Sequence, residues 1–133
     1  MTPAKITATP GLAAGISSNR GQVLLRDLLA ALDAMQNKKL IAGDYVLPDG
    51  KCCALGALGL ARGIDPEDMI SLEDSDHRAA KLFGASISLI MEIERVNDQD
   101  LELDLRYRTN DEVQERRWAR TREWVASKIT AEA

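Results

Sequence analysis

Residues 49–63 read Asp49-Gly50-Lys51-Cys52-Cys53-Ala54-Leu55-Gly56-Ala57-Leu58-Gly59-Leu60-Ala61-Arg62-Gly63, the least polar segment of the chain. The run of small apolar residues predicts a short helix that begins at Cys52 and stops at Gly63. Glycine inside a helix costs about 1 kcal/mol relative to alanine, so Gly56 and Gly59 indicate that another backbone approaches closely. We therefore expect a buried central helix on which longer amphipathic helices pack.

Amphipathic helices are predicted on both sides of this segment. Leucines and Met35 recur at three- and four-residue spacing over residues 20–36, with Ser18 or Asn19 as the N-cap. The last helix begins with a capping box of Thr109 and Glu112, and its apolar face extends to Ile129.

Shorter helices are expected between these two. Asp65 and Pro66 begin a helix that ends near Leu72. Ser75 and Ser86 are the expected N-caps of two further helices, and Gly84 separates them.

The sequence therefore predicts a mainly α fold, a compact single-domain helical bundle of five to six helices over 19–130. Residues 1–18 hold prolines, glycines and small polar residues, and are expected to form a flexible arm. Residues 101–107 alternate apolar and polar side chains. A short two-stranded ribbon with residues 44–47 and an irregular connection are the two alternatives there.

Composition limits the classes of function. The 133 residues suffice for one domain, and the net charge of −4 does not favour nucleic acid as a partner. No apolar run reaches the ~18 residues that span a bilayer, and no signal-peptide layout is present. We expect a cytoplasmic protein without a membrane partner or a cofactor, and a homodimer is compatible with the sequence.

Cys52 and Cys53 suggest one catalytic alternative, a papain-like cysteine hydrolase. A thiol at a helix N-terminus is favoured as the thiolate, His77 is the only histidine, and Asn97 would orient it. Buried structural cysteines are the simpler interpretation. A metal site is not predicted, because adjacent cysteines lack the usual ligand spacing.

Residues 77–93 suggest a second alternative, a helix-turn-helix DNA-binding regulator that acts as a dimer. Two helices meet at Gly84, as they do in bihelical DNA-binding units. The positions that would face the groove, including Ser86, Met91 and Glu92, hold none of the residues best suited to base edges.

The final helix carries an arginine-rich surface with two tryptophans. Arginine and tryptophan are enriched in the parts of protein interfaces that contribute most to binding. The predicted partner-binding residues are Arg116, Arg117, Trp118, Arg120 and Trp124.

The block Cys53-Ala54-Leu55-Gly56-Ala57-Leu58, followed by Val96-Asn97-Asp98, resembles small uncharacterised phage, prophage and bacterial proteins that carry a Cys-Ala-Leu-Gly-Ala segment and a later Asn-Asp. The resemblance covers residues 50–100 and implies a compact helical domain of phage type. It makes Cys53 and Asn97-Asp98 the positions of most interest. Our leading interpretation is a small phage-type accessory protein that binds a protein partner without catalysis, for example to modulate or inhibit a host factor or defence complex.

Overall fold

The structure, a computed structural model, describes residues 11–70, 72, 75–99 and 110–130. Seven helices lie in these ranges: α1 (Leu12–Ser17), α2 (Asn19–Ala34), α3 (Ala54–Ala61), α4 (Pro66–Ile70), α5 (Asp76–Phe83), α6 (Ile87–Asp98) and α8 (Asn110–Lys128). The predicted mainly α bundle is confirmed, with one helix more than the upper end of the predicted number. The described residues form no strand, and Val46 and Cys52 make an isolated antiparallel bridge.

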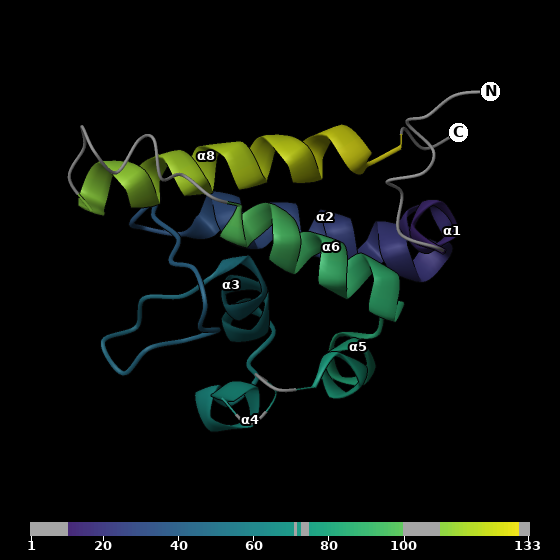
Figure 1. Cartoon of the computed structure of the whole chain (residues 1–133), viewed down its shortest axis with the longest axis horizontal. Helices are drawn as coiled ribbons and strands as arrows, with labels where there is room; N and C mark the ends of the chain where they lie inside the picture. Colours follow the sequence, from purple (N-terminus) through teal and green to yellow (C-terminus); the bar gives the residue numbers. More distant parts are fainter. Residues whose placement is uncertain (1–10, 71, 73–74, 100–109, 131–133) are drawn as a thin grey trace.

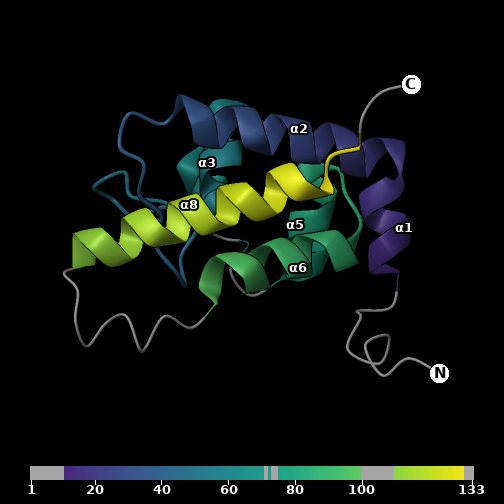
Figure 2. The same cartoon turned by 90° about the horizontal axis from the view of Figure 1, so that it is seen from above.

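The helices lie in layers (Figure 1). α2 and α6 form the middle of the molecule, α8 packs across one side of this pair, and α3 packs on the other side. Figure 2, a view from above, shows α8 lying along both α2 and α6. α1 crosses one end and contacts α2 and α6, while α5 packs on α6 and α4 packs on α3. α6 therefore contacts four other helices.

α3 is the central buried helix that the sequence predicted. Ala54 to Gly59 are all buried, and α2, α4 and α6 pack on this helix. A Cβ atom added to Gly56 would collide with the backbone carbonyl of Tyr45. This confirms the predicted close approach of a second backbone. At Gly59 the prediction was wrong, because the neighbour is the Met69 side chain.

The side-chain caps explain where most helices begin. Ser18, Ser75 and Ser86 each accept a hydrogen bond from the backbone N–H three residues later, at 3.0–3.2 Å. Gly84 ends α5 at a φ of 74°, a left-handed conformation that glycine adopts without strain. α3 begins at Ala54, two residues later than predicted, because Cys53 is its N-cap and Cys52 pairs with Val46.

Three predictions fall partly or wholly outside the described residues. Leu12–Ser17 form α1, where the sequence predicted part of a flexible arm, and residues 1–10 are not described. The predicted ribbon strand at 101–107 and the cap residue Thr109 are not described either. None of the described helices has both the length and the apolar character needed to cross a lipid bilayer.

Candidate functional site

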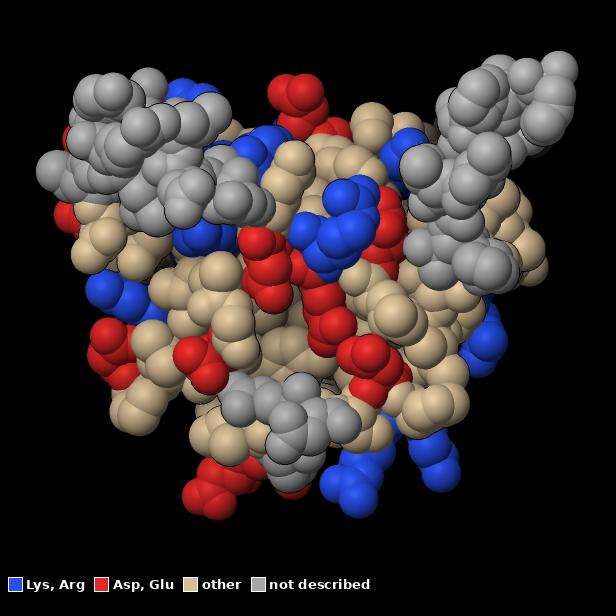
Figure 3. Space-filling view, in the orientation of Figure 1, with Lys and Arg blue, Asp and Glu red and all other residues tan. Residues whose placement is uncertain are grey.

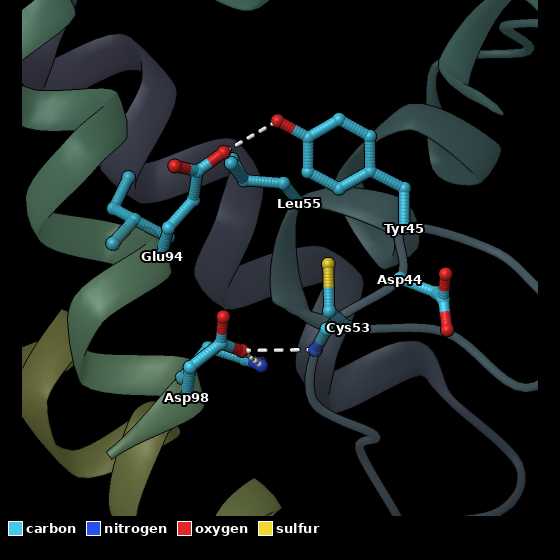
Figure 4. Close-up of a pocket in the computed structure, with 9 residues that line it drawn as sticks. Asp44, Tyr45, Cys53, Leu55, Glu94 and Asp98 are labelled. Atoms are coloured by element: carbon cyan, nitrogen blue, oxygen red, sulfur yellow. Dashed lines mark hydrogen bonds between the residues drawn. The ribbon is translucent and has the colours of Figure 1, made fainter. Parts of the chain in front are cut away.

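A pocket of about 130 Å³ lies between α6 and the segment that leads into α3. Glu94 and Asp98 stand on the α6 side, and Asp44, Tyr45 and Cys53 stand on the opposite side (Figure 4). The remaining lining residues are Gly43, Leu55, Ile93 and Asn97. The lining thus combines three carboxylates, a phenol and a thiol with the apolar side chains of Leu55 and Ile93.

Tyr45 is fixed in the pocket wall by backbone pairing and by packing. Its carbonyl accepts a hydrogen bond from the N–H of Cys53 at 3.0 Å. Its ring meets Phe83 edge-on, with 6.4 Å between ring centroids. The Tyr45 hydroxyl donates a hydrogen bond of 2.5 Å to Glu94 (Figure 4). This bond links the loop before α3 to α6.

Asn97 joins the same two parts of the chain at the base of the pocket. Its Oδ1 accepts a hydrogen bond from the N–H of Ala54 at 2.9 Å, which caps α3 from another helix. Its Nδ2 donates to the carbonyl of Ile41 and to Oδ1 of Asp98, at 2.9 and 2.8 Å. Asp98 also accepts from the N–H of Gly43 at 3.4 Å. Every polar atom of the Asn97 side chain is therefore used within the fold.

The carboxylates around the pocket repel one another. Burial raises the pKa of Glu94 to about 7; the hydrogen bond from Tyr45 opposes this shift, and the nearby carboxyls of Asp76 and Asp98 add to it. Burial and the Glu94 carboxylate also raise the pKa of Tyr45. Acidic side chains gather in the middle of the face on which α6 lies (Figure 3). A carboxyl that titrates near neutral pH beside a pocket is characteristic of functional sites.

Both candidate nucleophiles are buried. Burial raises the pKa of Cys52 to about 11 and that of Cys53 to about 12. The sulfur of Cys53 accepts a hydrogen bond from the N–H of Gly56 at 3.4 Å, the thiol version of a helix N-cap. His77 is an exposed residue of α5, and Asn97 bonds to backbone groups and to Asp98. The arrangement favours a structural role for both thiols.

The predicted helix-turn-helix residues form α5 and α6, which pack on each other. α6 is also covered by α1, α3 and α8. Of the positions predicted to face DNA, Ser86 caps the helix, Glu92 bonds to Arg95, and Met91 is exposed. The open side of α6 also holds Glu94 and Asp98, and carboxylates there oppose phosphate.

The arginine-rich surface of α8 is partly used inside the fold. Arg117 donates to the carbonyl of Leu40 at 3.1 Å, and burial lowers its pKa. Trp118 donates from Nε1 to the carbonyl of Leu32 at 3.0 Å. Arg120 bonds to the carbonyl of Gln99 at 3.4 Å.

The two other members of the predicted interface keep exposed area. Arg116 is exposed, and Trp124 is half-buried, with the Lys128 ammonium 5.9 Å from its ring centroid. All five predicted residues keep some exposed area, and their role as a partner-binding surface stays a prediction.

The sequence singled out Cys53, Asn97 and Asp98, and the structure brings all three to one pocket. It did not single out Asp44, Tyr45 or Glu94, because nothing in their spacing differs from ordinary surface positions. Among the described residues, no three His, Cys, Asp or Glu side chains are grouped so as to hold a metal ion.

Comparison with protein-family models, with curated proteins and with solved structures found no match for this chain.

Proposed function

We propose that this protein acts without catalysis, as a binding protein whose acidic pocket receives an arginine side chain of a protein partner. The observation that carries the proposal is the pocket itself, a cavity of about 130 Å³ whose lining includes Glu94 and Asp98 of α6 and Asp44 of the facing loop. A guanidinium group is the cation that best matches several carboxylates at once, because it presents five donors in a rigid plane.

The size of the pocket supports this assignment. A cavity of roughly 150 Å³ holds a molecule the size of benzene, so a slightly smaller pocket fits a guanidinium group and the adjacent methylene. The floor contributes apolar contact through Leu55 and Ile93. These contacts suit the carbon stem of the arginine side chain.

The charge of the pocket supports it as well. The described salt bridges pair Lys39, Arg62, Arg95 and Arg122 with carboxylates that do not line the pocket. Asp98 is attracted by Arg117 on α8, and Glu94 is bonded to a phenol. A cation from a partner would relieve the repulsion among these carboxylates.

The other two interpretations have less support. A cysteine hydrolase needs a thiolate near neutral pH, and both thiols have raised pKa values. A recognition helix needs a free side that accepts phosphate and the major groove, and the open side of α6 carries the carboxylates of Glu94 and Asp98. On α8, Arg116 is exposed and Trp124 is half-buried, so a partner that docks beyond the pocket can reach both.

The test is a titration of ¹⁵N-labelled protein with Nα-acetyl-arginine amide, followed by NMR at pH 8. Nα-acetyl-citrulline amide, a neutral ligand of nearly the same shape, is the control ligand. We expect saturable shifts at Tyr45, Cys53 and Asp98 with the arginine compound, and none with citrulline.

Matched variants locate the binding. Asp44→Asn should weaken binding of the arginine compound, since it removes a carboxylate from the pocket lining. Glu115→Gln, an exposed carboxylate on α8 outside the pocket, should leave binding unchanged. Equal shifts with both ligands, or no shift at the pocket residues, would overturn the proposal.

A further inference from the structure

Glu94 lies among acidic groups from three parts of the fold. Asp98 is one turn further along α6, Asp76 comes from α5, and Asp44 comes from the loop before α3. The neutral neighbours are Tyr45, whose hydroxyl donates to Glu94, and the buried thiol of Cys53. Two arginines lie close to this group: Arg117 of α8 attracts Asp98, and Arg95, next to Glu94 on α6, is paired with Glu92.

Glu94 interacts electrostatically with the carboxyls of Asp76 and Asp98, and interacting carboxyls do not ionise independently. Repulsion within the group is lowest when one member keeps its proton. Glu94 is the member that combines burial with two acidic neighbours, and its pKa is raised to about 7. Glu94 is therefore the member of the group best placed to keep that proton.

We propose that the pocket is a proton-coupled cation site, in which Glu94 holds a proton while the pocket is empty and releases it to solvent when a guanidinium group enters. This inference rests on the proposed function and adds to it a regulation by pH. The incoming cation takes over the role of the proton, since either one reduces the negative charge facing Tyr45, Asp76 and Asp98. Binding is then strongest where Glu94 is already ionised.

Thermodynamic linkage between proton release and cation binding determines the direction and the size of the effect of pH on affinity. Only the ionised form of Glu94 pairs with the cation, so affinity falls as pH drops below about 7. For one coupled proton with this midpoint, the affinity at pH 8 exceeds that at pH 6 by about tenfold.

The experiment measures binding of Nα-acetyl-arginine amide to the full chain by calorimetry at pH 6 and pH 8. At pH 7 it is repeated in two buffers that differ in ionisation enthalpy, which gives the number of protons released. In parallel, a ¹³C NMR titration of the free protein follows the Glu94 carboxyl. We expect a Glu94 midpoint near 7, proton release at pH 7, and roughly tenfold tighter binding at pH 8.

Two variants assign the proton to its residue. Glu94→Gln should bind with the same affinity at both pH values, to within about twofold, because it carries no titrating carboxyl. Histidine is the other side-chain type that titrates in this range, so His77→Gln is the control and should keep the full pH dependence. Circular dichroism melts at pH 6 and 8 establish that each variant is folded.

The outcomes separate the two proposals. Binding with equal affinity at pH 6 and pH 8, or a free Glu94 that titrates below pH 5, would overturn the coupling and leave the arginine pocket standing. Absence of binding at pH 8 would overturn the arginine pocket itself, and the coupling with it.

Discussion

The side-chain oxygen of Asn97 lies 2.9 Å from the backbone nitrogen of Ala54, 43 positions earlier in the chain, and caps α3 from α6. The same side chain donates to the carbonyl of Ile41. Asn97 thus holds together the helix that is most deeply buried, the loop that precedes it, and one wall of the pocket.

Asn97→Ala should lower the free energy of unfolding by about 2–3 kcal/mol, because it leaves a buried N–H and a buried carbonyl without a partner. Urea unfolding followed by circular dichroism measures the change. Asn37→Ala, at an exposed position after α2, is the control and should change stability by less than about 0.5 kcal/mol. Equal losses in the two variants would show that the cap contributes nothing.

The two glycines of α3 should respond differently to alanine. Gly56→Ala drives a Cβ atom into the backbone carbonyl of Tyr45, which cannot move without breaking its bond to Cys53. Such overpacking costs about 1–3 kcal/mol. At Gly59 the added atom meets the flexible end of Met69, and the gain in helix propensity of about 1 kcal/mol offsets the contact. In thermal melts, Gly56→Ala should therefore have a clearly lower midpoint temperature than Gly59→Ala. The reverse order would contradict the close approach of the Tyr45 backbone.

The thiols should be unreactive in the native protein. With pKa values of about 11 and 12, Cys52 and Cys53 present far less thiolate at pH 8 than a free cysteine, whose pKa is ~8.5. Labelling by iodoacetamide, read by mass for each cysteine, should run at least ~100-fold slower than that of glutathione. It should accelerate in urea. Rapid labelling with a pH midpoint under ~8.5 would instead support the hydrolase hypothesis. His77→Ala would then be the next variant to test.

Neighbouring arginines on α8 should differ in their effect on stability. Arg117→Gln removes the hydrogen bond to the carbonyl of Leu40 and should cost about 1–2 kcal/mol in the free energy of unfolding. Arg116→Gln, at an exposed position, should cost less than about 0.5 kcal/mol. A partner contact on α8 is therefore best tested through Arg116. If Arg117→Gln were as stable as the parent protein, the hydrogen bond to Leu40 would contribute nothing to stability.

Stability should depend on pH through Glu94. Its pKa is raised in the folded state to about 7, from an ordinary value of 4.5. The contribution of protonated Glu94 to the free energy of unfolding is therefore fully present below about pH 4.5. It is lost as pH rises through about 7. Relative to Glu94→Gln, the parent protein should lose free energy of unfolding between pH 5 and pH 8.

Tyr45→Phe extends the same measurement. This substitution removes the hydrogen bond that stabilises the Glu94 carboxylate. The pKa of Glu94 should therefore rise further, and the free energy of unfolding should keep falling to higher pH. Urea unfolding at four pH values between 5 and 8 tests both variants. A difference between parent and Glu94→Gln that stays constant with pH would contradict the raised pKa.

The sequence by itself determined the local structure. Ser75 and Ser86 cap the helices they were predicted to cap, and Gly84 ends α5. Ser18, one of the two predicted alternatives, caps α2. These features follow from hydrogen bonds and backbone conformations that span only a few residues. The burial of α3 also followed from composition, because a segment without polar side chains has no favourable place at the surface.

Only the tertiary structure determined which residues line the pocket and which arginines form hydrogen bonds within the fold. Tyr45 and Glu94 are 49 positions apart, and their contact exists only because α6 packs beside the loop that leads into α3. Arg117 turns inward for a carbonyl that the packing of α8 brings within reach. Charge and spacing in the sequence fix which groups a helix carries. The neighbours that bury them, shift their pKa values or consume their hydrogen bonds are fixed by how the helices pack.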